Sequence, residues 1–492
     1  MSEQQSSYRQ IMKATSLFGG VQVFQILIQI IRSKFIAILL GPAGMGIAGL
    51  LNSTIGLIGG LTNFGLGTSA VKNVAEANET GNGTRISTII TVLRRLVWFT
   101  GTVGFAITII LSPWLSQLTF GNKDYTVAFI WISITLLFSQ LTNGQLVLLQ
   151  GMRKLQYLAK ANVYGSALGL IITIPLYYKW GVDAIVPGII ITSLISLAMS
   201  LFFSSRIKIQ PVKVSKVRTI AEGKNMLMMG FMISLSGLIG LGASYLLRIF
   251  ISNTGGVAQV GLYSAGFTII GTYVGLVFTA MSTDYYPRLS GIAYDNQKAT
   301  NMINQQAEIA ILILAPILCV FLVFINWVVI LLYSTKFVAV NGMIHWAALG
   351  MFFKAASWSI AIIFLAKSAS KLFFWNELIT NIYLLGFNIL GYKYGGLDGL
   401  GISFLLSYFL YFVQVYMITH RKYAFKLDKS FIKIISLQLL IAIGCFFIVK
   451  LIITPYSYIG GTFLILISAI FSLHELNKRM DLKQILSTIK KK

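Results

Sequence analysis

Long apolar stretches of the sequence contain basic side chains, among them Arg32, Arg248 and Lys354. A cation at the centre of a membrane helix costs about 2.5–3.5 kcal/mol on insertion scales. Such a residue is therefore expected to face a partner or a water-filled cavity rather than lipid. A cationic cavity selects an anionic cargo, because an opposite charge offsets the loss of hydration. The forked donors of arginine suit phosphate in particular. Arg248 lies near the end of its stretch, so its guanidinium could instead reach the membrane surface.

Amide side chains recur at helical spacing in the same apolar stretches. They are Gln25, Gln29, Asn52, Asn63 and Asn143. Gln25 and Gln29 fall on one stripe with Arg32, because residues three or four apart share a helix face. We assign these amides to the wall of the cationic cavity. Hydrogen bonds between neighbouring helices are the alternative role for amides, and helix packing is the alternative for the glycines beside them.

Acids and other reactive side chains are few in these stretches. Asp284, Glu308 and Glu377 stand near the ends of theirs, and the sequence assigns them no partners, so we expect a net positive cavity. Two cysteines and three scattered histidines form no metal-ligand set. No nucleophile–base pair and no nucleotide-binding lysine motif is present. We therefore predict a protein that is not an enzyme and that has no cofactor and no metal site.

The composition requires a membrane around these side chains. The 492 residues are 56% hydrophobic and 11% charged, whereas a soluble domain carries about 25% charged residues. This arithmetic excludes a soluble enzyme, a disordered chain and a secreted disulfide scaffold. The net charge of +25 would suggest nucleic acid as a partner of a soluble protein. In a membrane protein it reflects cytoplasmic loops rich in Lys and Arg, so we expect no nucleic-acid partner.

Runs of about 20 apolar residues predict an all-α integral membrane protein with about fourteen transmembrane helices. The runs are too long and too uniformly apolar for the strands of a β-barrel. The expected spans are 17–40, 46–71, 88–112, 126–150, 161–178, 184–204, 226–251, 261–285, 307–333, 344–366, 375–394, 400–419, 433–453 and 457–473.

The basic clusters set the predicted orientation. They fall on the even-numbered connections and the C-terminal tail, at 153–160, 206–224, 421–429 and 478–492. By the positive-inside rule, both termini are cytoplasmic. The start of the chain reads as an uncleaved first span, and residues 482–489 read as a basic amphipathic helix on anionic lipid or as a solvated tail.

A weak internal sequence repeat predicts two pseudo-symmetric six-helix bundles. Arg32 is followed by Gly46 fourteen residues later, and Arg248 by Gly261 thirteen later. An even number of spans in each half makes the repeat parallel. The expected organisation is an N-terminal lobe at 1–205, a basic cytoplasmic linker at 206–225, a C-terminal lobe at 226–420, two additional helices at 421–473 and a basic cytoplasmic tail at 474–492.

Four motifs in order resemble the Wzx-type O-antigen translocases of the polysaccharide transporter branch of the MOP exporter superfamily. They are LGPAGMGIAGL (40–50), LTFGNKDY (118–125), YYPRLS (285–290) and LLYSTKFVAVNGMIHWAALGMFFK (331–354). The resemblance spans about residues 10–420. Many of these translocases end after twelve spans, and fourteen spans are similar to the lipid II flippases of the same superfamily.

The resemblance implies a flippase that moves a polyprenyl-diphosphate-linked oligosaccharide across a bacterial inner membrane. It also implies alternating access between two six-helix lobes and drive from an ion gradient. Arg32 and Arg248, at equivalent places in the two halves, would then hold the diphosphate. Lys354 would supply a third cation deeper in, and the amides would bond sugar hydroxyls. Membrane lipids are further partners, and polysaccharide polymerase and chain-length machinery are candidate ones. Asp284 and Arg288 form a hypothetical inner gate.

Three other functions stay open at this point. A lipid II flippase would use the same architecture for a peptidoglycan precursor. A MATE-like drug or cation antiporter would need a carboxylate in its cavity. A membrane glycosyltransferase, or an O-antigen ligase or polymerase, would usually need a large external loop with catalytic residues, and the expected outer loops here are short.

Overall fold

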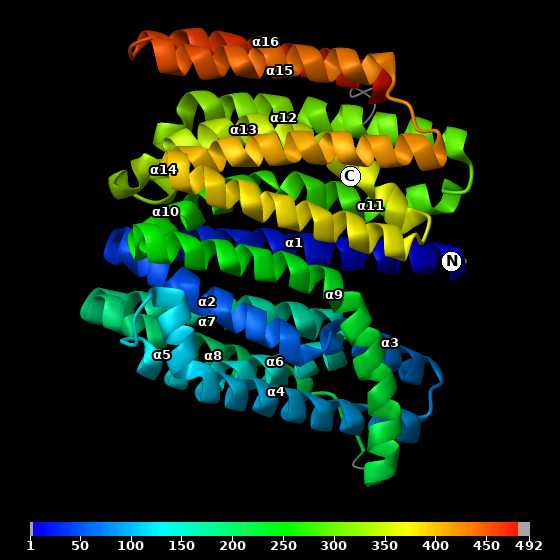
Figure 1. Cartoon of the computed structure of the whole chain (residues 1–492). Helices are drawn as coiled ribbons and strands as arrows, with labels where there is room; N and C mark the ends of the chain where they lie inside the picture. The colour runs from blue at the N-terminus through cyan, green and yellow to red at the C-terminus, as the bar shows by residue number, and fades with distance from the viewer. Residues whose placement is uncertain (1–2, 211, 481–492) are drawn as a thin grey trace. The chain divides into compact units, whose positions relative to one another are not determined.

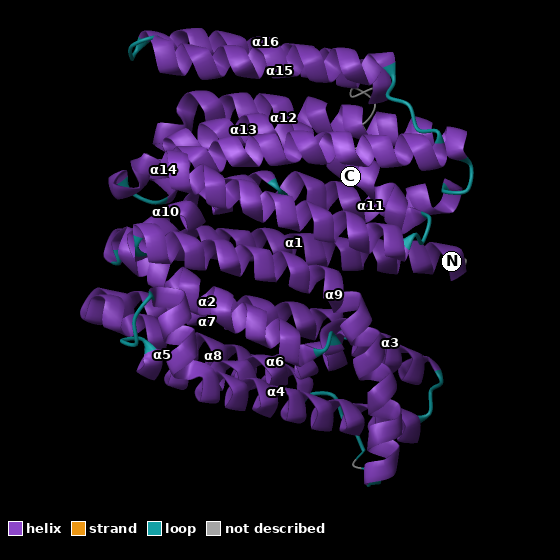
Figure 2. Cartoon of the chain, in the orientation of Figure 1, coloured by secondary structure: helices purple, strands orange, loops and turns teal. Residues whose placement is uncertain are grey.

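The computed structural model describes residues 3–210 and 212–480, and in this part of the chain every regular element is helical (Figures 1 and 2). Two compact units divide the chain, the first ending at Gly261 and the second beginning at Leu262. This architecture confirms the predicted all-α class. The predicted amphipathic segment 482–489 lies outside the described residues.

The first unit begins with a long helix and ends inside a short one. Its helices are α1 (Glu3–Leu39), α2 (Gly41–Asn63), α3 (Leu66–Glu79), α4 (Gly83–Phe120), α5 (Thr126–Ile132), α6 (Ile134–Gly151), α7 (Leu155–Trp180), α8 (Ile185–Ser204), α9 (Lys216–Gly255) and the start of α10 (Val257–Phe267). The second unit continues with a π-helical turn (Thr268–Val274) and α11 (Leu276–Ile292), α12 (Asn296–Leu332), α13 (Asn341–Ala366), α14 (Ser370–Tyr423), α15 (Lys429–Leu451) and α16 (Tyr456–Met480).

Eleven segments of the described residues are long and apolar enough to cross a membrane. Two of them, Leu155–Ser204 and Ser370–Tyr423, contain 50 and 54 residues. At 1.5 Å per residue they would extend about 75–80 Å, more than twice the thickness of a hydrocarbon core. Each is interrupted in the middle, the first by a 3₁₀ turn at Gly181–Ala184 and the second at Gly396, whose φ is 55°. The interruptions fall where the sequence separates paired spans, but the count of fourteen stays a prediction.

A reciprocal backbone contact joins the starts of α2 and α10. A Cβ added at Gly46 would lie 1.8 Å from the Val257 carbonyl oxygen, and one at Gly261 would lie 1.9 Å from the Pro42 carbonyl oxygen. Both pairs, Pro42 with Val257 and Gly46 with Gly261, are separated by 215 residues. Reciprocal contacts of this kind occur where two copies of a repeat meet on a two-fold axis. The two pseudo-symmetric bundles inferred from the sequence stay a prediction.

The start of α9 packs on the helices that precede it in the first unit. Ser215 caps this helix, so the second half of the expected 206–225 linker is already helical. α9 contacts α2, α3 and α4, and its backbone comes so close to the α2–α3 turn that a Cβ at Gly65 would lie 1.9 Å from the Gly230 carbonyl oxygen. The predicted lobe boundaries stay a prediction.

Candidate functional site: a polar cavity around Arg32

The first unit contains a polar cavity of about 370 Å³. Five helices supply its walls: α1, α2, α6, α7 and α8. Its lining consists of Arg32, Ile36, Ala48, Asn52, Ile55, Thr135, Ser139, Thr142, Asn143, Tyr177, Gly188, Ile189, Thr192, Ser193 and Ser196. The cavity therefore combines one cation with many hydroxyl and amide groups inside a bundle that is otherwise apolar.

Arg32 is positioned by α8. Its Nη2 donates a hydrogen bond to Thr192 Oγ1 at 3.1 Å. That oxygen in turn donates to the Gly188 carbonyl at 2.7 Å, so it is the acceptor for the arginine. Arg32 is half-buried, and it is the one charged residue among the described residues that line the cavity. The described lining of this cavity is consequently net positive.

The other polar groups in the wall are arranged mainly as acceptors. Ser196 donates its proton to the Thr192 carbonyl at 2.9 Å, and Thr142 donates to the Phe138 carbonyl at 2.8 Å. Asn52 uses its Nδ2 on the Ala48 carbonyl at 2.8 Å. A hydroxyl that donates to its own helix keeps lone pairs for a ligand, and Asn52 keeps its Oδ1. The wall can thus accept protons from ligand hydroxyls while Arg32 donates to an anion.

The structure brings together three of the eight predicted cavity residues: Arg32, Asn52 and Asn143 line the same space. Gln25 and Gln29 lie on α1 but outside this lining, and Gln29 is exposed. Asn63, the last residue of α2, has a buried Oδ1 that accepts no hydrogen bond from the described residues.

Arg248 is held within its own helix. Its Nη1 donates to the hydroxyl of Ser244, one turn earlier on α9. The residue is half-buried and does not line the Arg32 cavity. Its predicted role in holding the cargo stays a prediction.

Lys354 lies in the second unit, on α13, among aromatic rings of α14. Its Nζ stands 5.1 Å from the ring centre of Tyr408 and 5.7 Å from that of Phe404. Cation–π contacts at this range stabilise a partly desolvated ammonium by about 0.5–2 kcal/mol. These rings therefore provide a favourable contact for the Lys354 ammonium within an apolar helix.

A hydrogen-bonded cluster connects the two halves of α14. Gln414 Nε2 donates to Asn376 Oδ1 at 2.8 Å, and Tyr411 donates to Glu377 Oε1 at 3.3 Å. Asn376 Nδ2 in turn donates to the Tyr411 hydroxyl at 3.2 Å. The sequence points to Glu377 but not to its partners, which come from a part of the helix more than thirty residues away.

The predicted gate residues form an ion pair on a single helix. Arg288 Nη1 lies 3.0 Å from Asp284 Oδ2, and both side chains are more than 60% exposed. A surface pair of this spacing contributes about 0.3–0.5 kcal/mol. The gate hypothesis stays a prediction.

Sequence reasoning missed most of the hydroxyl groups in the Arg32 cavity. Thr192 and Ser196 are four residues apart on α8, and this spacing is a signal for one polar face. The run is otherwise so apolar that it predicts only a span. Tyr177 could not be assigned from the sequence, because tyrosines are common near membrane surfaces.

Comparison with known proteins places the chain among membrane transporters. The family described as "polysaccharide biosynthesis protein" matches residues 35–342. The chain is 25% identical over 405 residues to a putative O-antigen transporter of Shigella flexneri, covering 80% of this chain and 94% of the relative. It is 21% identical over 385 residues to the lipid III flippase of Escherichia coli K12, covering 77% and 91%.

A solved structure shares the fold. The lipid II flippase MurJ in an inward closed conformation superposes with a TM-score of 0.68 at 11% identity, over 94% of this chain and 99% of that one. At this identity the likeness concerns the fold alone. Together with the family match over more than half of the sequence, it is consistent with the resemblance drawn from the motifs. The chain belongs to the polysaccharide biosynthesis protein family, and its helical fold is similar to that of the lipid II flippase MurJ.

Proposed function

We propose that this protein moves a polyprenyl-diphosphate-linked oligosaccharide, a repeat unit of O antigen or a related surface polysaccharide, to the outer leaflet of a bacterial inner membrane. The observation that carries the proposal is the Arg32 cavity, in which one guanidinium is surrounded by hydroxyl and amide acceptors. A diphosphate needs the cation, and sugar hydroxyls need the acceptors. The relatives named as an O-antigen transporter and a lipid III flippase support the same class of cargo.

The mechanism is alternating access of two lobes. Arg32 binds the diphosphate, and Arg248 and Lys354 supply further cations along the path. The sugar chain contacts the hydroxyl and amide wall while the polyprenyl tail stays in the bilayer. Both termini lie in the cytoplasm.

An ion gradient drives the transport in this proposal. Glu377 is a suitable place for a coupling proton, because a carboxylate can exchange a proton and its neighbours can bond either form. Tyr411 donates to its Oε1, and the Asn376–Gln414 pair holds Tyr411 in place. The coupling ion itself is identified by the response of transport to each gradient.

A drug or cation antiporter is disfavoured by the cavity wall. Such a protein needs a carboxylate beside its cationic substrate. The described residues that line the Arg32 cavity include no acid.

The proposal is tested with purified full-length protein in vesicles. A fluorescent polyprenyl-diphosphate oligosaccharide is placed in both leaflets, and the fraction that becomes accessible to a membrane-impermeant quencher is followed with and without a proton or sodium gradient. We expect faster exchange of this lipid than of lipid II, and no uptake of a cationic dye. Equal or faster exchange of lipid II would instead favour a peptidoglycan-precursor flippase.

A further inference from the structure

A second recess, separate from the Arg32 cavity, lies where the start of α9 crosses α4. It has a volume of about 650 Å³. Its lining consists of Phe64, Arg95, Leu96, Phe99, Thr219, Ile220, Gly223, Lys224, Leu227, Met228 and Phe231. Eight of these eleven residues carry no polar side-chain group, and the two charged ones are both cations. No lining residue is shared with the Arg32 cavity.

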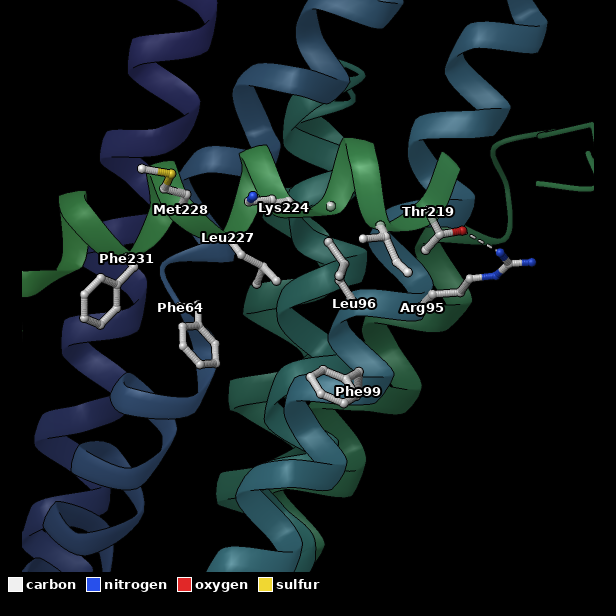
Figure 3. A pocket seen from close by; sticks show the side chains of 11 residues that line it. Phe64, Arg95, Leu96, Phe99, Thr219, Lys224, Leu227, Met228 and Phe231 are labelled. Carbon is white, nitrogen blue, oxygen red and sulfur yellow. Dashed lines mark hydrogen bonds between the residues drawn. The ribbon is translucent and has the colours of Figure 1, made fainter. Parts of the chain in front are cut away.

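Polar contacts hold α4 and α9 together around this recess, which we call the groove. Arg95 Nη1 donates to the Val214 carbonyl at 2.9 Å and to Thr219 Oγ1 at 2.6 Å, as the dashed line in Figure 3 shows for Thr219. Arg85 and Glu222 form a two-point ion pair between the same helices. These contacts therefore set the position of α9 on α4 and, with it, the position of the groove.

Apolar side chains form the rest of the wall. Phe64, at the α2–α3 turn, has its ring centre 6.2 Å from that of Phe231 on α9 (Figure 3). Phe99 is 60% exposed and Met228 is 63% exposed. Ile220 is 68% exposed. Large apolar groups exposed beside one another mark a surface that is covered by apolar material.

The two cations of the groove stand at the same depth in the membrane. Arg95 is the last charge on α4 before an uncharged run from 96 to 122, and the start of α9, which carries Lys224, crosses α4 beside Arg95 (Figure 3). A run of this length on α4 matches a hydrocarbon core, so charges at its cytoplasmic end lie at the level of the lipid headgroups. The groove thus has cations at headgroup depth and an apolar wall.

We propose that this groove binds an anionic glycerophospholipid of the cytoplasmic leaflet. Its phosphate would lie near Lys224 and Arg95, and one acyl chain would lie along Phe99, Leu227 and Phe231. Charge complementarity selects the anionic headgroup over a zwitterionic one. The flipped cargo is the less suitable occupant, because Thr219 is the one hydroxyl or amide side chain in the lining and an oligosaccharide needs many.

The test is native mass spectrometry of the full-length protein in mixed micelles. Phosphatidylglycerol, phosphatidylethanolamine and a polyprenyl phosphate are offered at equal concentration. We expect retention of phosphatidylglycerol, with its preference over phosphatidylethanolamine reduced about five-fold in Lys224→Gln, since one cation near the membrane surface contributes about 1 kcal/mol. Phe99→Ala should weaken retention of both phospholipids by removing part of the chain wall.

Matched variants separate the groove from general effects. Lys160→Gln removes an exposed cation of α7, and Trp98→Ala removes the 54% exposed neighbour of Phe99, which does not line the groove. Both should retain phosphatidylglycerol like the parent protein. Equal losses in the groove variants and these controls would overturn the proposal. Preferential retention of the polyprenyl phosphate that depends on Lys224 would also overturn it, in favour of the cargo lipid.

Discussion

At the scale of single residues, the three cations predicted to lie within the membrane have different surroundings. Arg32 faces a polar cavity and donates to Thr192, whereas Lys354 lies against the rings of Tyr408 and Phe404. Arg248 is anchored to Ser244 on its own helix. Because the three cations have different neighbours, substitutions at the three positions should affect transport to different extents.

Arg32→Gln should abolish glycan export while the amount of protein in the membrane stays constant. A hydrogen bond to a charged group contributes about 1.5–3 kcal/mol, so the cargo should bind roughly ten- to a hundred-fold more weakly. Arg32→Lys should retain part of the activity, because the charge is kept and the forked geometry is lost. Surface glycan is measured by immunoblot and protein by an epitope tag.

The matched control for Arg32 is Arg153→Gln, which removes a 72% exposed cation that pairs with Glu79 outside the cavity. Export by this variant should equal that of the parent protein. Full export by Arg32→Gln at equal protein level would rule out the assignment of the cavity.

Lys354→Ala should also abolish export, because it removes a half-buried cation from the second unit. Lys371→Ala, at an exposed position near the start of α14, is the control. The two variants are compared by export per molecule of protein. If Lys354→Ala lowers the protein level but leaves export per molecule intact, its cation–π contacts serve stability alone.

Glu377→Gln should uncouple transport from the ion gradient. Glutamine keeps an oxygen that can accept from Tyr411 but cannot release a proton. Exchange of the fluorescent cargo should then proceed at the same rate with and without a proton gradient. Asn381→Asp, one turn further along α14, tests whether any change of charge there has the same effect. A gradient response that survives in Glu377→Gln would exclude this residue as the coupling group.

At the scale of helices, glycine decides where backbones meet. Gly46 and Gly261 leave room for the carbonyls of Val257 and Pro42, and a side chain at either place would displace backbone rather than a flexible side chain. By contrast, a Cβ at Gly56, on the same helix α2, would meet nothing within 4 Å. The sequence alone does not distinguish Gly46 from Gly56, because both belong to the small-residue pattern of one apolar run.

Gly46→Val should therefore destabilise the protein by about 1–3 kcal/mol or more, the usual cost of overpacking. Gly56→Ala should have little effect on stability. The two are compared by thermal unfolding of the purified protein in detergent. Equal melting temperatures would show that the α2–α10 contact tolerates a side chain and is not a tight packing site.

At the scale of the whole molecule, topology can be tested independently of transport. The positive-inside rule places Lys123 outside the cell and Lys154 in the cytoplasm. Lys123→Cys should react with a membrane-impermeant maleimide in intact cells, and Lys154→Cys should react only after permeabilisation. The native Cys319 and Cys445 are both buried, so the parent protein provides the unlabelled control. Labelling of Lys154→Cys in intact cells would reverse the orientation.

The class of the molecule could be predicted from its amino-acid sequence. Composition and run length required a helical membrane protein, because only helices satisfy backbone hydrogen bonds within a single segment of lipid-embedded chain. Motif order pointed to the family, which the match over residues 35–342 bears out. The sequence also indicated Arg32, because a cation within an apolar run can be recognised without any knowledge of its neighbours.

The surroundings of each of these groups could not be predicted, because they depend on how distant segments pack. Thr192 and Tyr177 join Arg32 from helices more than a hundred residues away, and Gln29 on the same α1 stripe does not line the cavity. Helical spacing predicts which residues share a face of one helix, but the face that a neighbouring helix or a cavity meets depends on packing between distant segments. The groove at the α4–α9 crossing arises in the same way, because neither helix alone brings Arg95 and Lys224 to one recess.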